Sequence, residues 1–135
     1  MIVTIFLSFT DLGPVSTKIS YIGIMILIAG FILRQYSIKL LGKFFTPVVN
    51  KQKNQKIIEY GPYKYIRHPS YTGLLLELSG FSLSLSNIIS FIMVIFLLTP
   101  AILYRIRIEE IFLLGSFREY RDYKKTTKKL IPFLY

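Results

Sequence analysis

Three long hydrophobic runs alternate with short polar and basic segments along the chain. The runs are residues 19–33, 74–85 and 88–104. A helix needs about 20 residues to cross the hydrocarbon core of a bilayer. The first run reaches that length if Arg34 extends its side chain to the interface, and the third comes close to it. The second run is shorter and contains Glu77, so it spans a bilayer only with its flank, from about Ser70 onward.

The segments around these runs carry the signals of turns and surface stretches. Residues 1–9 are apolar but lack the basic region and cleavage site of a signal peptide, and we interpret them as part of a first helix or as an interfacial segment. Residues 34–46 mix bases with aromatic residues, which predicts a stretch lying at the membrane surface. Pro47 ends that stretch, and the polar residues 50–56 predict an exposed loop.

Hydrogen-bonding side chains are concentrated just before the second run, in GPYKYIRHPSYTG at residues 61–73. Pro69 suits the first turn of a helix, where its missing N–H costs nothing, so His68 should lie at the helix start. Small side chains on one face of this helix predict close contact with another helix. The residues that share the face are Gly73, Glu77, Gly80 and Ser84.

Charged residues follow the third run while the helical pattern continues. Arg105 and Glu109 are four residues apart, and Arg107 and Glu110 are three apart. Each pair therefore shares a side of one continuing helix. The two acids are either part of a site or solvated ends paired with the two arginines.

The composition agrees with a membrane protein. Hydrophobic residues make up 53% of the 135 residues and the mean hydropathy is +0.51, too apolar for an ordinary soluble domain of this size. We predict an all-α fold, a small polytopic integral membrane bundle of about three or four membrane helices with interfacial and C-terminal cytoplasmic helices. The length suits a single domain covering residues 1–135.

Positive charge is concentrated in two segments. Of the 17 Lys and Arg residues, eight lie in residues 34–67 and eight in residues 105–129, and the net charge is +10. If the second and third runs form a hairpin turning at Ser86 and Asn87, both segments lie on one side of the membrane. The positive-inside rule makes that side cytoplasmic, where the bases also attract anionic lipid headgroups. This distribution does not fit a nucleic-acid-binding protein.

Residue counts exclude several kinds of chemistry. The chain has no cysteine, which excludes thiol nucleophiles, disulfides and Cys-ligated metals, and with one histidine we expect no metal site. Neither a Walker A nor a G-x-G-x-x-G motif is present, so a Rossmann nucleotide site is not supported. Glu77 is a functional candidate as an ionisable group in an apolar segment, but pairing with an arginine is slightly favoured.

A polar pocket at the cytoplasmic face is the site that the residues themselves suggest. Its natural lining is Arg67, His68, Tyr71, Arg105, Glu109 and Glu110. Arg67 and His68 beside a helix start form a candidate anion site, because helix N-terminal amides and a cation both attract negative charge. For most of the tyrosines an aromatic belt at the interface is the default interpretation. These are Tyr63, Tyr65, Tyr71, Tyr120 and Tyr123.

At these residues the sequence resembles the isoprenylcysteine carboxyl methyltransferase family, within a wider group of membrane methyltransferases that includes phospholipid methyltransferases. The resemblance runs from about residue 34 to residue 132, which we take as the catalytic part. It rests on residues 34–46, 61–73, 104–110 and 127–132 and on the Tyr120 and Tyr123 pair. The RHPxYxG and RIxxEE elements, in that order around a hydrophobic hairpin, make it fairly specific.

The resemblance implies S-adenosylmethionine as the methyl donor, with S-adenosylhomocysteine as its product. Glu109 or Glu110 would bind the ammonium group or ribose hydroxyls of the donor, and Arg105 would face the acceptor carboxylate. These three form the implied catalytic group. The implied cofactor-binding residues are Tyr63, Arg67, His68, Tyr71, Gly73 and Glu110.

The implied acceptor is a carboxylate on a lipophilic, prenyl-like substrate in the bilayer, as in protein-S-isoprenylcysteine O-methylation. Two features depart from the family pattern: Arg118 follows Phe117 where a glycine is common, and Glu77 stands where a neutral residue is expected. Two other functions also fit the sequence. One is N-methylation of a phospholipid or other amine, and the other is a non-catalytic membrane lipid-binding subunit. The oligomeric state is left open.

Overall fold

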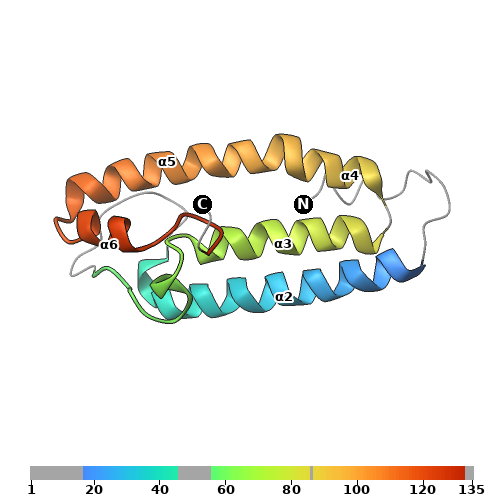
Figure 1. Cartoon of the computed structure of the whole chain (residues 1–135), viewed down its shortest axis with the longest axis horizontal. Coiled ribbons are helices and arrows are strands. Elements are labelled where there is room, and N and C mark those ends of the chain that lie inside the picture. The colour runs from blue at the N-terminus through green and yellow to red at the C-terminus, as the bar shows by residue number, and fades with distance from the viewer. Residues whose placement is uncertain (1–16, 46–55, 86, 133–135) are drawn as a thin grey trace.

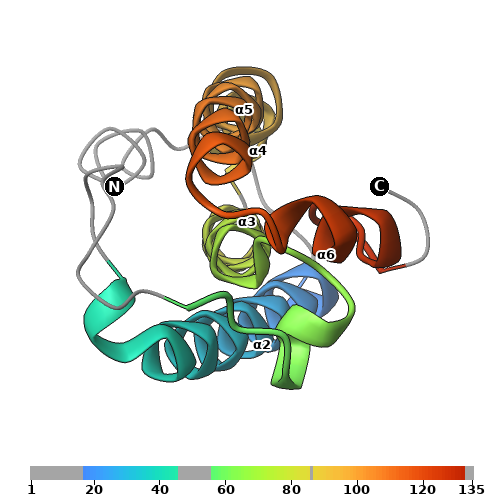
Figure 2. The same cartoon turned by 90° about the vertical axis from the view of Figure 1, so that its left-hand side faces the viewer.

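Three long helices form the body of the computed structural model, which describes residues 17–45, 56–85 and 87–132. They are α2 (Thr17–Leu41), α3 (Pro69–Ser84) and a continuous helix made of α4 (Ile88–Met93), the π-helical η3 (Val94–Leu98) and α5 (Thr99–Ser116). Figure 1 shows them side by side along their lengths, and the end view of Figure 2 places α3 between α2 and α5. The shorter helices are η1 (Gly42–Phe44), η2 (Gly61–Lys64) and α6 (Tyr120–Thr126).

All regular elements in the described residues are helices, which confirms the predicted all-α class. The helices start where the sequence predicted: α3 begins at Pro69 with His68 as its N-cap. Asn87 precedes α4, and its side chain accepts a 2.9 Å hydrogen bond from the Ser90 N–H. The side-chain oxygen thus satisfies one of the amides that a helix start leaves unpaired. The interpretation of residues 1–9, and most of the predicted loop 50–56, lie outside the described residues.

The first long helix differs from its predicted form. We expected a span ending near Arg34 and then a separate surface stretch, but α2 continues through Arg34 to Leu41. Gly42 follows with φ of +52°, a left-handed conformation that glycine adopts without steric cost. The basic residues after Arg34 therefore begin on the last turns of α2. The backbone hydrogen bonds of α2 continue without interruption where the sequence changes from apolar to basic.

Pro100 lies inside the third long helix without ending it. Proline has no N–H to donate and clashes with the preceding turn of an α-helix. The helix widens to π geometry over Val94–Leu98 just before it, and both the N–H and the hydroxyl of Thr99 bond the Val94 carbonyl. This local widening lets one helix run from Ile88 to Ser116.

Backbones of α2 and α3 approach unusually closely, as the small face of α3 predicted. A Cβ placed on Gly80 would lie 2.3 Å from the Leu27 nitrogen, and one on Gly73 would lie 2.7 Å from the Arg34 nitrogen. The sequence analysis did not identify the partner face on α2, where Gly23 and Gly30 are seven residues apart. Cβ atoms there would lie 2.3 and 2.4 Å from nitrogens of α3. The two helices therefore interlock through glycines on both sides.

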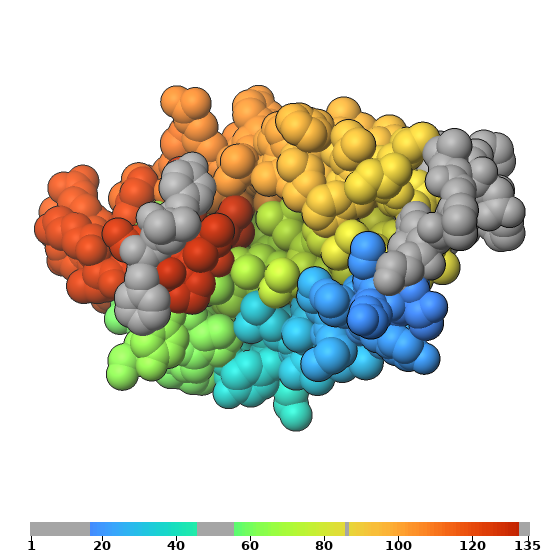
Figure 3. Space-filling model, turned by 45° about the vertical axis from the view of Figure 1, so that its right-hand side comes forward, coloured from blue at the N-terminus to red at the C-terminus, as the bar shows by residue number. Residues whose placement is uncertain are grey.

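In the part of the chain that the structure describes, two helices are long and apolar enough to cross a membrane: residues 17–44 and 88–116, with mean hydropathies of 1.7 and 2.1. Only 11% and 17% of their most apolar windows are buried inside the protein, unlike the core helix of a soluble domain. Figure 3 shows these helices covering much of one face, with α3 reaching the surface between them as a narrower strip. α3 itself has 16 residues, short of the usual span.

The C-terminal segment folds back against the start of α3. Ile66 and Lys128 form a parallel bridge, and the Thr72 hydroxyl donates a 2.8 Å hydrogen bond to the Leu130 carbonyl. Leu130 is buried against Ile102 and Ile106 of α5. In Figure 1 this segment, α6 and the residues before α3 gather at one end of the bundle. Motifs far apart in the sequence thus meet at that end.

Candidate functional site

The start of α3 is held in place from both sides of His68. The backbone N–H of Arg67 donates to the Lys128 carbonyl at 2.8 Å, and that of His68 donates to the Lys129 carbonyl at 3.1 Å. The His68 carbonyl in turn accepts the N–H groups of Tyr71 and Thr72 at 3.1 Å. His68 therefore links the first turn of α3 to the C-terminal segment, and its ring is 4% exposed.

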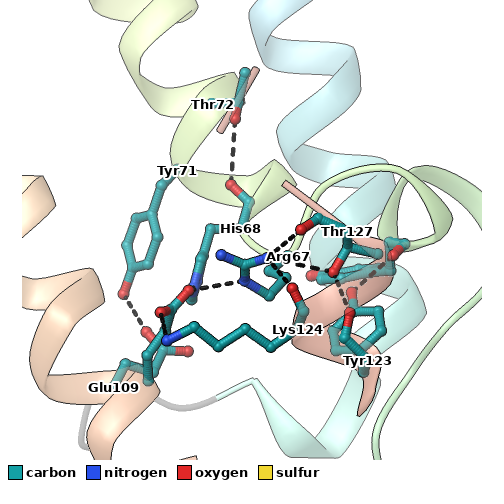
Figure 4. Close-up of polar contacts among 10 residues, drawn as sticks. Arg67, His68, Tyr71, Thr72, Glu109, Tyr123, Lys124 and Thr127 are labelled. Carbon is teal, nitrogen blue, oxygen red and sulfur yellow. Dashed lines mark hydrogen bonds and ion pairs between the residues drawn. The ribbon is translucent and has the colours of Figure 1, made fainter. Parts of the chain in front are cut away.

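Glu110 is the centre of a buried cluster of charges. Its Oε1 accepts a 2.8 Å hydrogen bond from Arg67 Nε, and its Oε2 lies 2.9 Å from Lys124 Nζ. Glu110 is 4% exposed, so this carboxylate is compensated by two cations that come from different parts of the chain. Figure 4 shows the side chains of Arg67 and Lys124 close to each other. The alternative of solvated acids at a helix end is wrong for Glu110.

Nη1 of Arg67 binds the end of α6. Nη1 donates to the Lys124 carbonyl at 3.1 Å and also to the Thr127 carbonyl. The predicted anion site at Arg67 is therefore filled by the protein itself, with Glu110 as the anion. Because Nε and Nη1 are both engaged, Arg67 connects α5, α6 and the start of α3.

A second polar chain runs through Tyr71, one turn into α3. The Tyr71 hydroxyl donates to Glu109 Oε2 at 3.0 Å and accepts from Arg105 Nε at 2.7 Å. The spacing of four between Arg105 and Glu109 on α5 allows both to reach one phenol. Three of the residues implied by the resemblance are thus brought together, with the carboxylate of Glu109 shown beside Tyr71 in Figure 4.

A pocket, called here the His68 pocket, opens beside these two polar chains. It holds about 630 Å³ of space not filled by protein, including the part open to solvent. Two of its lining groups, His68 Nε2 and the Tyr120 hydroxyl, are buried and make no hydrogen bond in the described structure. His68 Nε2 lies 3.4 Å from Glu110 Oε1 but lacks hydrogen-bond geometry. The lining is Leu41, Phe44, Lys56, Ile57, Ile58, Tyr63, Arg67, His68, Ser70, Glu109, Leu113, Phe117, Tyr120 and Tyr123.

Three tyrosines around the pocket are buried, which contradicts the aromatic-belt interpretation for them. Tyr63, Tyr120 and Tyr123 are 5%, 3% and 6% exposed, whereas Tyr65 is 52% exposed and can serve in a belt. The Tyr123 hydroxyl donates to the Tyr63 carbonyl at 2.7 Å and so ties α6 to η2. Burial raises the pKa of all three phenols, and for Tyr120 the charge of Glu110 raises the pKa further. They remain hydrogen-bond donors across the physiological range.

We expect these three phenols to stay protonated until the protein unfolds in alkali. Their folded pKa values lie above the unfolded value of about 10, so their contribution to stability is complete below pH 10 and is lost as the pH rises above it. Tyrosinate absorbance and helical circular dichroism, followed together from neutral to alkaline pH, test this. Tyr123→Phe should remove absorbance change from the unfolding step, because the raised pKa of this buried phenol delays its ionisation until the protein unfolds. Ionisation of all tyrosines before unfolding would contradict the expectation.

Two residues singled out in the sequence lie between α2 and α3 and do not line the His68 pocket. Gly73 was expected to contact the cofactor, but it faces Arg34 in the α2–α3 interface and does not line the His68 pocket. It is glycine because the helix backbones leave no room for a side chain. Glu77 Oε2 lies 4.0 Å from Arg34 Nη1, which supports the favoured interpretation of a pair with an arginine.

Sequence reasoning missed the contributions of α6 and of the segment before η2. Lys124 binds Glu110, and the Thr127 carbonyl binds Arg67. Both residues belong to a basic tract in which nothing in the sequence distinguishes one lysine from another. Ile57 and Ile58 line the pocket from a segment with no motif. One signal in the sequence could have identified this part of the pocket wall. It is the spacing of Tyr120 and Tyr123, which both line the pocket.

Comparison with known proteins shows what this arrangement resembles. Residues 22–114 match the model of the isoprenylcysteine carboxyl methyltransferase family. A probable protein-S-isoprenylcysteine O-methyltransferase of Oryza sativa subsp. indica is 32% identical over 119 residues, covering 86% of this chain and 62% of that protein. The protein-S-isoprenylcysteine O-methyltransferase of Rattus norvegicus is 34% identical over 123 residues, covering 87% of this chain and 43% of that protein.

A solved structure also matches over most of the chain. The eukaryotic intramembrane Ras methyltransferase described as isoprenylcysteine carboxyl methyltransferase superposes with a TM-score of 0.76 and 31% sequence identity. The match covers 87% of this chain and 43% of that one. The chain thus spans between 43% and 62% of the length of these relatives.

Proposed function

The chain belongs to the isoprenylcysteine carboxyl methyltransferase family, and we propose that it transfers a methyl group from S-adenosylmethionine to the carboxylate of a lipophilic, prenyl-like substrate. The observation that carries the proposal is the His68 pocket, with two buried polar groups that make no hydrogen bond to any described residue. Such groups cost free energy unless a ligand satisfies them. We take the domain as single, with its catalytic part at about residues 34–132.

The residues of the His68 pocket fit S-adenosylmethionine, which supplies a sulfonium methyl group as electrophile when bound. His68 Nε2 and the Tyr120 hydroxyl offer unused hydrogen-bonding capacity. Glu109 offers a carboxylate for the ammonium group or ribose hydroxyls, and Tyr71 holds that carboxylate in place. Glu110, which we had also considered for this contact, is engaged by Arg67 and Lys124 and positions the pocket wall instead.

Arg105 is the residue we assign to the acceptor carboxylate. A guanidinium binds a carboxylate through two parallel hydrogen bonds, which fixes its orientation. The acceptor is already ionised at neutral pH, so no strong general base is needed. Catalysis is then mainly the positioning of two reactants, and the Tyr71 bridge sets Arg105 at a fixed place relative to Glu109.

We further propose a multi-pass topology with the active site on the cytoplasmic side. The C-terminal end of α2, the start of α3 and the end of α5 lie at one end of the bundle (Figure 1). The described parts of both basic segments lie on the end of α2, on η2 and the start of α3, on the end of α5 and on α6. The positive-inside rule supports a cytoplasmic location for it. A soluble donor and a bilayer-borne acceptor can both reach such a site.

Binding of S-adenosylhomocysteine to the full chain in detergent, measured by calorimetry, tests the cofactor assignment. We expect saturable binding that weakens roughly tenfold to hundredfold in His68→Ala. Tyr120→Phe should weaken binding by about fivefold to tenfold while leaving thermal stability unchanged, because the hydroxyl it removes makes no internal hydrogen bond. Tyr65→Phe is the matched control and should bind as the wild type. Absent binding by the wild type would overturn the proposal.

Product analysis separates the acceptor classes. With methyl-labelled donor and a prenylcysteine substrate, we expect a base-labile methyl ester, and its formation should be lost in Arg105→Ala while S-adenosylhomocysteine binding persists. A base-stable methylamine from a lipid amine would favour N-methylation instead. Binding without any product would favour a non-catalytic subunit.

A further inference from the structure

A second cavity, called here the Arg107 groove, lies between α5, α6 and the C-terminal segment. It holds about 1100 Å³ of space not filled by protein, including the part open to solvent, and it shares no lining residue with the His68 pocket. The proposed methyl transfer leaves it without a role. The groove is lined by Leu103, Tyr104, Arg107, Glu110, Ile111, Leu114, Lys124 and Lys129.

The lining combines positive charge with an apolar wall. Arg107, Lys124 and Lys129 reach the groove from three different segments. The single acid, Glu110, is 4% exposed and is already engaged by Arg67 and Lys124, so it leaves the groove net positive. Leu103, Ile111 and Leu114 supply the apolar side. A ligand that fits is therefore an anion carrying a hydrocarbon part.

The position of the groove along the third long helix matches the depth of lipid headgroups. Residues 88–104 carry no charge, and Arg107 is the twentieth residue counted from Ile88. At 1.5 Å per residue, that length equals the hydrocarbon thickness of about 30 Å. Tyr104 lines the groove just before Arg107 and is 68% exposed, as expected of a tyrosine at the membrane interface.

The geometry points to a binding site for the phosphate headgroup of an anionic membrane phospholipid in the Arg107 groove. Arg107, Lys129 and Lys124 surround the phosphate, and an acyl chain runs along the hydrophobic side of α5 past Leu103. A zwitterionic lipid fits less well, because its own cation meets the same three bases. The inference rests on the proposed membrane topology but not on methyl transfer.

Lipid retention by the full chain, purified in a neutral detergent and measured by native mass spectrometry, tests the site. Phosphatidylglycerol should bind more tightly than phosphatidylcholine with the same acyl chains. Arg107→Gln combined with Lys129→Gln should weaken phosphatidylglycerol binding by about 30-fold, since each base near an anionic headgroup contributes about fivefold. Inorganic phosphate at the same concentration should not displace the lipid.

Arg118→Gln combined with Arg121→Gln is the matched control. It removes the same charge from two exposed positions, one just before α6 and one within it, that do not line the groove, and it should change binding less than twofold. If the first double variant fails to fold, Arg107→Gln alone, at an exposed position, should still lose about fivefold. Equal binding of both lipids, equal loss in both double variants, or displacement by inorganic phosphate would overturn the inference. Lipid binding with no detectable methyl transfer would count only against the proposed function.

Discussion

Replacing Glu110 by glutamine is expected to lower the free energy of unfolding by about 3–5 kcal/mol, the usual cost of removing one partner from a buried ion pair. The change leaves the guanidinium of Arg67, which is 9% exposed, without its counter-charge, and it also removes the anion that Lys124 contacts. A loss of that size is a large part of the 5–15 kcal/mol that ordinarily stabilises a domain. S-adenosylhomocysteine binding should fall as well, because Arg67 and His68 would lose their fixed position.

Thermal and denaturant unfolding in detergent, followed by helical circular dichroism, measure the first effect. Glu119→Gln, at an exposed position, should change the free energy of unfolding by less than about 0.5 kcal/mol. Glu109→Gln distinguishes the roles of the two acids. It should weaken S-adenosylhomocysteine binding but lower the free energy of unfolding much less than Glu110→Gln does, because Glu109 faces the pocket. A Glu110→Gln protein with wild-type stability would show that the charge cluster does not hold the site together.

The second large effect is expected for Gly80→Ala, which should destabilise the protein by about 3 kcal/mol. The added Cβ would lie 2.3 Å from the Leu27 nitrogen and 2.7 Å from the Gly23 oxygen, both of them backbone atoms. Rotation of a side chain cannot relieve such contacts, so α2 and α3 must separate along their interface. A looser interface also shifts Arg34, next to Gly73, and with it the start of α3.

Gly115→Ala is the control for the second prediction and should have the opposite sign. Among the described residues no other part of the chain lies within 4 Å of a Cβ at Gly115, and the residue is in the last turn of α5, which ends at Ser116. Alanine there should stabilise the helix by about 0.5–1 kcal/mol, because glycine loses more backbone freedom on folding. Both variants are compared by thermal unfolding in the same detergent. Equal effects of the two substitutions would exclude backbone contact as the cause.

Much of the helical framework could be predicted from local patterns. Uncharged runs determine where helices enter an apolar environment, and Pro69 places a helix start directly after His68 for steric reasons. The spacing of Gly73 and Gly80 likewise identified a close-packing face, because helical periodicity is a local property. The relation of Arg105 to Glu109 followed from the same rule, and the structure places both at Tyr71.

Errors arose where a contact between distant segments decides the outcome. α2 was predicted to end near Arg34, because the change to basic sequence was taken as the end of the helix, yet its hydrogen-bond ladder continues to Leu41. Tyr120 was assigned to the interface because a tyrosine in a basic tract has no local sign of burial, yet in the folded chain it is buried. Gly73 was assigned to the cofactor by its place in a motif, and the structure adds a close contact with α2 that the motif does not indicate.

The sequence by itself determined the helical membrane architecture, the position of His68 at a helix start and the residues from which a site had to be built. Only the tertiary structure decided how the two acids differ: Glu110 is buried between Arg67 and Lys124, and Glu109 faces the pocket with Tyr71. Adjacent residues on a helix point in directions about 100° apart, so one acid can enter the core while its neighbour lines a cavity. Which of the two acids is buried depends on how α6 and the C-terminal segment pack against α5. No local sequence pattern indicates that packing.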